Sequence, residues 1–258
     1  MASSSSSSSL LLRHPWTNDI EKIFTPESRL QLPTEFPFTP EDLSREDESD
    51  DSLFYTGPRF VQHIDAGAIY ALKLFYGDLF SKYVDFKNSE KEGIDCLDLC
   101  SSWVSHYPDE IPYGRVHGVG LNELELQRNG LLDGDYSVLD LNKIPSLSHL
   151  SDKSFDVVTI TVSIDYLNKP VAVLKECLRV LRNGGSIVIS FSNRMFPTKA
   201  VKYWREGSNA DRVFYTGVCL NVATLHDGSR FTEIEAYDLS PHMKTDPLFV
   251  VTASCRRS

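Results

Sequence analysis

The fold is decided by the stretch "SFDVVTITVSIDYLNKPVAVLKECLRVLRNGGSIVISFSN", residues 154–193. Residues 155–163 form a nearly continuous apolar and β-branched run, which is typical of a strand covered on both faces. Apolar residues then recur at three- and four-residue spacing, which predicts a helix over 168–182. The "NGG" at 183–185 ends this helix, and 186–192 is a second buried strand. The stretch therefore predicts two parallel strands joined by a helix.

The same alternation extends in both directions along the chain. Short apolar runs predict strands over 94–100, 115–121 and 136–141, with a short helix over 122–129. Beyond the central unit, helices are predicted over 198–206 and 209–223, and strands over 231–239 and 248–254. No helix separates the last two strands, so one of them is expected to run antiparallel. The fold class is α/β, a mostly parallel Rossmann-like sheet with helices on both faces and a terminal antiparallel hairpin.

The N-terminal part has a different composition. Residues 1–52 are rich in Ser, Pro and acids and have weak periodicity, which predicts an irregular extension. Apolar residues such as Ile64, Ile69 and Leu72 recur at helical spacing, which predicts an amphipathic helix within 54–80. We therefore expect three parts: an extension over 1–52, a helical lid segment over 53–90 and the main domain over 91–258.

Charge narrows the range of partners. The formal net charge is −10, and "PEDLSREDESDD" (40–51) contributes seven acids against one arginine. Neither this stretch nor the rest of the chain attracts a phosphate backbone, which argues against a nucleic-acid partner. No apolar run reaches the ~20 residues that span a bilayer, which argues against a membrane protein. The sequence leaves the oligomeric state open.

Five cysteines lie at 96, 100, 177, 219 and 255. Their odd number and scattered spacing predict reduced thiols in an intracellular protein, with no disulfide frame and no metal site. The seven serines near the N-terminus and the acid-free run to Asn18 also suit a plastid transit peptide. We expect a cytoplasmic protein, with the plastid as the alternative.

The block from Phe155 to Asn193 resembles the class I S-adenosylmethionine-dependent methyltransferases of the broad "methyltransferase type 11" kind. It matches their fourth strand, the following helix, the "R-V-L-x-P-G-G" turn and the fifth strand, with Asn183 at the proline position. The resemblance covers residues 90–256. It implies a seven-stranded sheet, S-adenosylmethionine as the cofactor and a transferred methyl group.

The first strand of this family ends in "D-h-G-x-G-x-G", where h is apolar, and the loop holds the amino-acid end of the cofactor. Asp98 and Leu99 match the start of this motif, whereas its glycine positions hold Cys100, Ser102 and Val104. Glycine lets the backbone approach a ligand closely. We expect the hydroxyls of Ser101 and Ser102 to bind a carboxylate instead. Trp103 can stack on the adenine or cover the cofactor.

Two further cofactor positions are implied by the resemblance. The family has an acid after its second strand that binds the ribose hydroxyls, and Gly120 stands there in this chain. Asn122 or Glu123 can take that bond from the next turn; without a partner, the ribose loses about 1.5–3 kcal/mol. After the third strand, Asp140 matches the acid that meets the adenine amine, and Leu141 and Asn142 line the same rim.

Candidate catalytic residues come from positions near the expected mouth of the site. Asp165 and Tyr166 follow the fourth strand, at a position that faces the methyl group in this family. His63 belongs, with Tyr55 and Arg59, to the predicted lid. A base is needed only when the acceptor arrives protonated, because methyl transfer is an in-line displacement with a good leaving group.

The alternatives concern the cofactor, the acceptor and activity itself. "GVGLNE" (118–123) lacks the third glycine of a nicotinamide-cofactor loop and follows the wrong strand, which excludes that reading. The "N-P-P-[YF]" motif of base and amide methyltransferases is replaced by "SIDY" (163–166), so a small-molecule acceptor is expected. The rival hypothesis is a catalytically inactive relative that serves as a binding or regulatory subunit.

Overall fold

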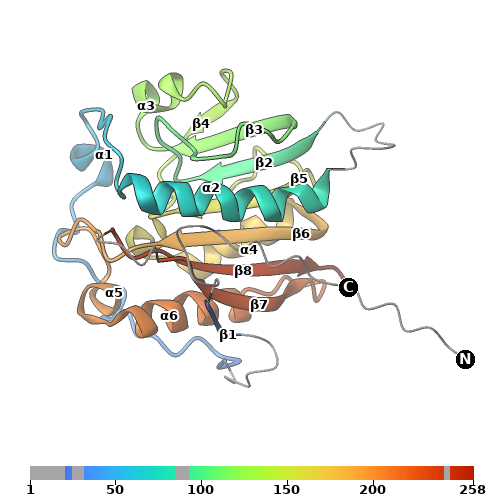
Figure 1. Cartoon of the computed structure of the whole chain (residues 1–258). Helices are drawn as coiled ribbons and strands as arrows, with labels where there is room; N and C mark the ends of the chain where they lie inside the picture. Colours follow the sequence, from blue (N-terminus) through green and yellow to red (C-terminus); the bar gives the residue numbers. More distant parts are fainter. Residues whose placement is uncertain (1–20, 25–31, 85–92, 241–244) are drawn as a thin grey trace, which may run out of the picture.

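Eight strands form one sheet in the order β1-β7-β8-β6-β5-β2-β3-β4 (Figure 1). The computed structural model describes residues 21–24, 32–84, 93–240 and 245–258. The strands are β1 Glu21–Phe24, β2 Ile94–Leu99, β3 Tyr113–Gly120, β4 Tyr136–Val138, β5 Phe155–Thr161, β6 Leu181–Phe191, β7 Arg230–Asp238 and β8 Phe249–Arg256. The helices are α1 Asp51–Phe54, α2 Ala66–Phe80, α3 Glu123–Arg128, α4 Pro170–Val180, α5 Lys202–Glu206 and α6 Asn209–Val222, with short 3₁₀ turns η2 Ser81–Tyr83 and η3 Ile164–Tyr166.

Strand directions confirm the predicted fold class. The pairs β2–β3, β3–β4, β2–β5 and β5–β6 are parallel, whereas β6–β8 and β7–β8 are antiparallel. Seven strands therefore form the expected mostly parallel sheet with an antiparallel end. β1 adds an eighth strand antiparallel to β7, with Glu21 opposite Asp238. Part of the extension predicted to be irregular thus joins the sheet.

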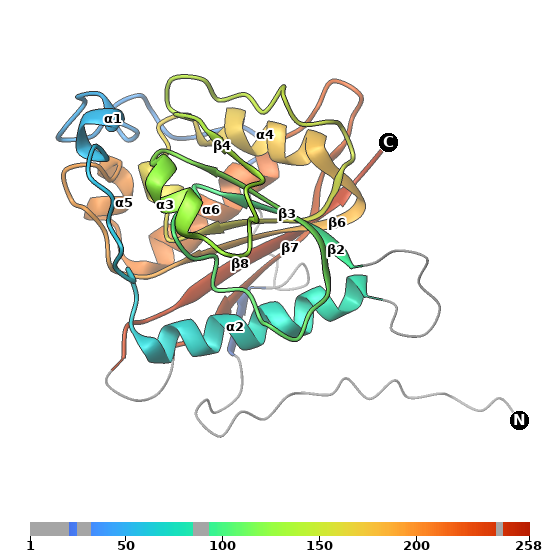
Figure 2. The ribbon, with the colours of Figure 1, turned by 90° about the horizontal axis from the view of Figure 1, so that it is seen from above.

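Helices cover both faces of this sheet, with α2 on one face and α4 and α6 on the other (Figure 2). In β5 the adjacent residues Val157 and Val158 point to opposite faces of the sheet, and both are fully buried, one in each of two hydrophobic cores. Only a two-sided sheet buries successive residues of one strand in this way. This explains the continuous β-branched run that marks the strand in the sequence.

The predicted lid helix has a different boundary and a different place. Helix α2 begins at Ala66, where the Asp65 carboxylate accepts a hydrogen bond from the Ala68 N–H (2.9 Å). It buries Leu72, Tyr76 and Phe80 completely against the sheet. Residues 55–63, predicted to be helical in part, instead form an irregular loop across the carboxyl ends of the strands, called here the lid loop.

Other boundaries shift by a few residues. β6 begins at Leu181 and includes the "NGG" turn, where Gly184 has φ +77°, so the predicted helix ends two residues earlier than expected. α5 occupies only half of the predicted segment 198–206. All five cysteines are free, and four of them are buried. In the part of the chain that the structure describes, no helix is long and apolar enough to cross a membrane.

Candidate functional site

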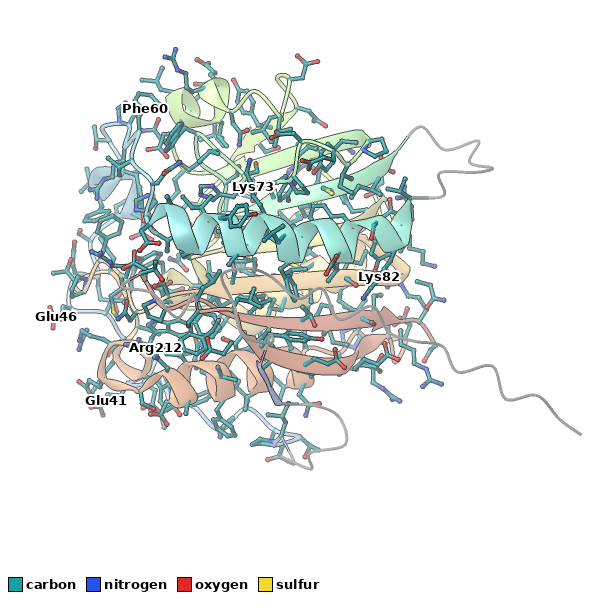
Figure 3. The ribbon with its side chains drawn as sticks, viewed as in Figure 1. Glu41, Glu46, Phe60, Lys73, Lys82 and Arg212 are labelled. Carbon is teal, nitrogen blue, oxygen red and sulfur yellow. The ribbon has the colours of Figure 1, made fainter. Side chains whose placement is uncertain are left out.

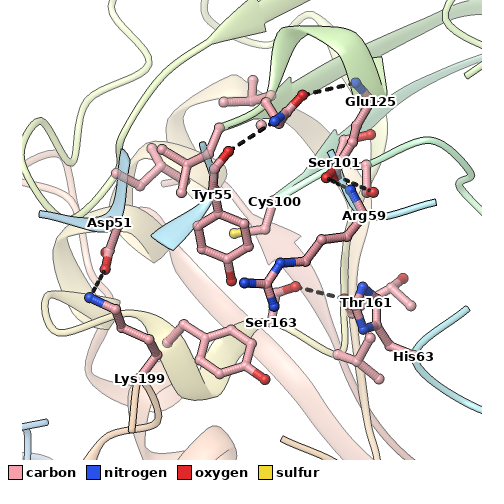
Figure 4. A pocket seen from close by; sticks show the side chains of 18 of the residues that line it. Asp51, Tyr55, Arg59, His63, Cys100, Ser101, Glu125, Thr161, Ser163 and Lys199 are labelled. Atoms are coloured by element: carbon pink, nitrogen blue, oxygen red, sulfur yellow. Dashed lines mark hydrogen bonds and ion pairs between the residues drawn. The ribbon is translucent and has the colours of Figure 1, made fainter. Parts of the chain in front are cut away.

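The candidate site is a pocket at the carboxyl ends of β2, β3 and β5, beneath the lid loop (Figure 4). The strand order reverses between β2 and β5, and this switch point is where open α/β sheets bind ligands. Most of the predicted cofactor and lid residues line this pocket: Tyr55, Arg59, His63, Asp98, Cys100, Ser101, Ser102, Trp103, Gly120, Asn122, Asp140, Leu141, Asn142 and Tyr166. Residues as far apart in the sequence as Tyr55 and Tyr166 therefore meet around one cavity.

The loop 100–104 keeps a left-handed backbone without glycine. Cys100 has φ +57°, a conformation that favours glycine, at the first glycine position of the family motif. The Asp98 carboxylate holds the loop by accepting hydrogen bonds from the hydroxyls of Ser101 (2.6 Å), Ser105 (2.7 Å) and Thr159 (3.3 Å). Burial raises the pKa of Asp98 to about 6, against the opposing effect of these hydroxyls.

These contacts change the role expected of the two serines. A hydroxyl has one hydrogen to donate, and that of Ser101 goes to Asp98. The Ser102 hydroxyl donates to Glu125 Oε2 (2.5 Å). In this conformation neither serine hydroxyl has a hydrogen left for the carboxylate of a ligand.

Gly120 is required by the same loop. A Cβ on Gly120 would overlap the main-chain carbonyl oxygen of Ser101. The Ser101 N–H also donates to the Val119 carbonyl (2.7 Å), which holds the loop against β3. The acid that the family places here is therefore excluded by backbone rather than simply missing.

Helix α3 supplies a carboxylate that the sequence reading missed. Glu125 is 6% exposed and lines the pocket; its Oε1 accepts from the Arg59 N–H (2.7 Å). Asn122 caps the helix by accepting from the Glu125 N–H (3.2 Å), and its Nδ2 donates to the Tyr55 carbonyl (2.9 Å). The lid loop is thus fastened to α3 at two backbone groups. The signal available in the sequence was Asn122 as an N-cap. In a helix capped in this way the third residue, here Glu125, lies beside the cap.

Glu123, the other residue considered for the ribose, is exposed. Its carboxylate accepts from the Tyr136 hydroxyl (3.3 Å), and it does not line the pocket. Asp140 lies on the pocket rim as expected, where its Oδ1 accepts from the Asn142 (2.9 Å) and Lys143 (3.3 Å) N–H groups. One carboxylate oxygen of Asp140 is thus engaged in its own turn.

Asp165 is not brought to the pocket. It is 2% exposed, its carbonyl oxygen accepts from the Val201 N–H (2.9 Å), and its Oδ2 lacks a hydrogen-bond partner among the described residues. Burial raises the pKa of Asp165 to about 8. The 3₁₀ turn after β5 points Asp165 inward and its neighbour Tyr166 outward, where the Tyr166 hydroxyl accepts from the Phe196 N–H (2.9 Å). The candidate catalytic groups that share the pocket are therefore Tyr166 and His63.

Aromatic rings and a histidine form the other side of the pocket. His63 lies edge-on to Phe196, with ring centroids 5.6 Å apart. Burial lowers the pKa of His63 below 6.5, so the imidazole is neutral at pH 7. Burial and the nearby Asp165 raise the pKa of Tyr55, which keeps its phenol protonated.

The acidic stretch before the lid loop is bound to the domain, and residues 41–51 are called here the acidic strap. Lys199, whose side chain is 1% exposed, lies 3.1 Å from both Asp47 and Asp51. Arg45 also pairs with Asp51 (2.8 Å). Further pairs join the strap to the domain: Lys143 with Asp50, Lys202 with Glu41, and Arg205 with Glu46. Figure 3 shows Glu41 and Glu46 along the edge of the molecule beside α5.

Comparisons with known proteins agree with this arrangement. Residues 102–189 match the family described as "Methyltransferase domain". No protein with a curated function matches the chain in sequence.

Among solved structures, an S-adenosylmethionine-dependent methyltransferase from Mesorhizobium loti is 18% identical (TM-score 0.43), covering 65% of this chain and 93% of that one. One from Aquifex aeolicus is 17% identical (TM-score 0.43), covering 84% and 98%. The [4+2]-cyclase SpnF is 14% identical (TM-score 0.47), covering 80% and 92%.

The pocket fits S-adenosylmethionine in two respects and departs from the family in one. Cys100 has a left-handed backbone at the position where the family motif has glycine, and Asp140 and Leu141 line the same pocket. The ribose acid is absent at Gly120, and Glu125 is the buried carboxylate nearest to that position along the chain. Residues 102–189, about a third of the chain, thus match a methyltransferase domain, and the pocket lies at the point where the strand order of this domain reverses.

Proposed function

We propose that this protein transfers a methyl group from S-adenosylmethionine to a small-molecule acceptor. The observation that carries the proposal is the position of the lid loop, which runs over the pocket and is fastened to α3 through Glu125 and Asn122. A covered pocket admits a small molecule more readily than a folded chain or a duplex. The net charge of −10 further disfavours a nucleic-acid substrate.

The cofactor, when bound, supplies an electrophilic methyl group on a sulfonium. The backbone of loop 100–104 would hold its amino-acid end, and Asp140 and Leu141 would border its adenine. Trp103 donates from Nε1 to the Val61 carbonyl (3.1 Å), and this hydrogen bond holds the lid loop against loop 100–104. Exclusion of water by such a cover favours alignment of the acceptor with the methyl group.

Two pocket residues can assist an acceptor that carries a proton. His63 is neutral at pH 7, so it can accept a proton from an acceptor hydroxyl or thiol. Tyr166 can orient the acceptor by a hydrogen bond, because its phenol oxygen already accepts the Phe196 N–H and its own hydrogen can point into the pocket. We assign His63 as the base and Tyr166 as the orienting group.

The test has a binding stage and a transfer stage. Calorimetric titration of the purified full chain with S-adenosylmethionine and S-adenosylhomocysteine should give micromolar affinity. Methyl-labelled S-adenosylmethionine is then incubated with a cell extract divided by ultrafiltration into small-molecule and macromolecular fractions. Label is expected in the small-molecule fraction and reduced by His63→Asn. Folded protein that binds neither nucleotide at millimolar concentration would instead support the inactive relative.

A further inference from the structure

Arg59 of the lid loop is a pocket cation without a carboxylate partner among the described residues. Its guanidinium donates from Nη2 to the Phe54 carbonyl (3.0 Å), and no described acid lies within ion-pair distance. The other two cations that line the pocket, Arg45 and Lys199, both pair with Asp51. Glu125 contacts Arg59 through the main chain: its Oε1 accepts a hydrogen bond from the Arg59 N–H (2.7 Å).

The Arg59 guanidinium lies beside a group of aromatic rings. Its carbon lies 4.1 Å from the centre of the Phe54 ring and 4.7 Å from that of Phe196, with Tyr55 at 5.6 Å. Figure 4 shows the side chain extending into the pocket toward Tyr55 and Ser163. The Phe54 and Phe196 centroids lie 5.2 Å apart, so these rings gather on one side of the guanidinium, and the edge that carries its other N–H donors has no acceptor among the described residues. That edge matches a carboxylate, which two parallel N–H···O bonds can hold.

The position of Arg59 favours the acceptor over the cofactor. Phe196 follows β6 and Tyr166 follows β5, on one side of the switch point, whereas Gly120 ends β3 and Asp140 follows β4 on the other. The cofactor would occupy the second side. We infer that the acceptor carries a carboxylate bound by Arg59 and a flat apolar body that lies among Tyr55, Tyr166 and Phe196. This inference rests on the proposed function and specifies its substrate class.

The experiment compares acids with matched amides. Full-length protein saturated with S-adenosylhomocysteine is titrated with benzoate and cinnamate and with benzamide and cinnamamide, with binding followed by ligand-detected NMR. Loss of a bidentate charged pair should weaken binding about tenfold to a hundredfold. The acids should therefore bind at least tenfold more tightly than the amides, and Arg59→Gln should remove the difference. Arg128→Gln, which removes one charge from an exposed site on α3, should preserve it.

Thermal melting establishes that the variants are folded, and Arg59→Lys, which keeps the charge without the fork, should show an intermediate effect. S-Adenosylhomocysteine and 5′-methylthioadenosine, which lacks the amino-acid carboxylate, separate the two sources of a carboxylate. A loss of affinity in Arg59→Gln for the first but not the second would assign Arg59 to the cofactor and overturn the inference. Acids that bind no better than amides would overturn it as well, with the proposed function intact. Failure of the wild-type protein to bind S-adenosylhomocysteine would overturn both.

Discussion

The substitution Gly120→Asp restores the acid that the resemblance places at the ribose. The resemblance predicts that this variant binds the cofactor more tightly, whereas the structure predicts weaker binding and a less stable fold. A carboxylate on the two ribose hydroxyls would add about 1.5–3 kcal/mol to cofactor binding. The structure allows no such gain, because a Cβ at 120 overlaps the Ser101 carbonyl oxygen. The obstacle is backbone, which cannot rotate away as a side chain can.

The cost has two parts. Overpacking against a buried backbone group costs about 1–3 kcal/mol. Displacing Ser101 also breaks the hydrogen bond from its N–H to Val119 O (2.7 Å), a further loss of about 1 kcal/mol. Gly120→Asp should therefore destabilise the fold by about 2–4 kcal/mol, and it should weaken cofactor binding because loop 100–104 moves with Ser101.

The assay is urea unfolding together with calorimetric titration by S-adenosylhomocysteine. Gly120→Ala carries the Cβ without the charge and should lose about the same stability. Gly130→Ala is the control, since a Cβ at Gly130 meets no atom within 4 Å. Wild-type stability in Gly120→Asp, together with tighter binding of S-adenosylhomocysteine, would refute the steric argument.

Three further predictions concern the loop, the buried acid and the strap. Cys100→Gly should change the free energy of unfolding by less than about 1 kcal/mol. Cys100→Val should cost about 1–3 kcal/mol more, because a β-branched residue is strained at φ +57°. Equal stabilities of the two variants in urea unfolding would contradict the strained turn. Asp165 has its pKa raised from 3.8 to about 8, so the folded state keeps a proton that the unfolded state releases, and stability falls as pH rises through that window. Asp165→Asn should remove this loss of stability, measured as the difference between the unfolding free energies at about pH 5 and about pH 8. A pH dependence equal to that of the wild type would show that Asp165 is not its source. Asp51→Ala leaves Arg45 and Lys199 as buried cations without their shared carboxylate and should cost about 3–5 kcal/mol, with amide exchange in the acidic strap rising first; strap amides as protected as in the wild type would exclude this role.

The central strands β2 and β5 were predictable from the sequence because both are short, mostly apolar and buried on both faces, whereas β1 was not predicted. β5 and β2 lie within a residue or two of their predicted ends, since polar residues mark both of their carboxyl ends. The lid loop was not predictable in this way. The apolar residues that follow it have helical spacing, and nothing local shows that the helix starts only at the Asp65 cap.

The site was predicted in its positions but not in its contacts. The resemblance placed Asp98 and Ser101 at the pocket, but their mutual hydrogen bond, which occupies the serine, depends on the rotamers of packed side chains. Glu125 was missed because it acts on the main chain of Arg59, 66 residues away. The strap pairs were missed for the same reason: a run of acids in sequence does not show which cations lie opposite.

The acidic strap has a consequence for how the protein is made. It leaves the ribosome early, whereas its partner Lys199 follows the strap contact Ser49 by 150 residues. At ordinary rates of synthesis that delay is about 8–30 s. One wall of the pocket therefore closes only after most of the sheet has been translated.

The same arrangement divides the N-terminal region by its tolerance to cutting. Removal of residues ahead of Glu41 leaves every described strap pair in place. Removal of residues up to and including Asp51 takes away both carboxylates that pair with Lys199 and leaves its buried ammonium without them. A maturation step or an affinity tag is therefore compatible with a finished pocket only on the upstream side of the strap.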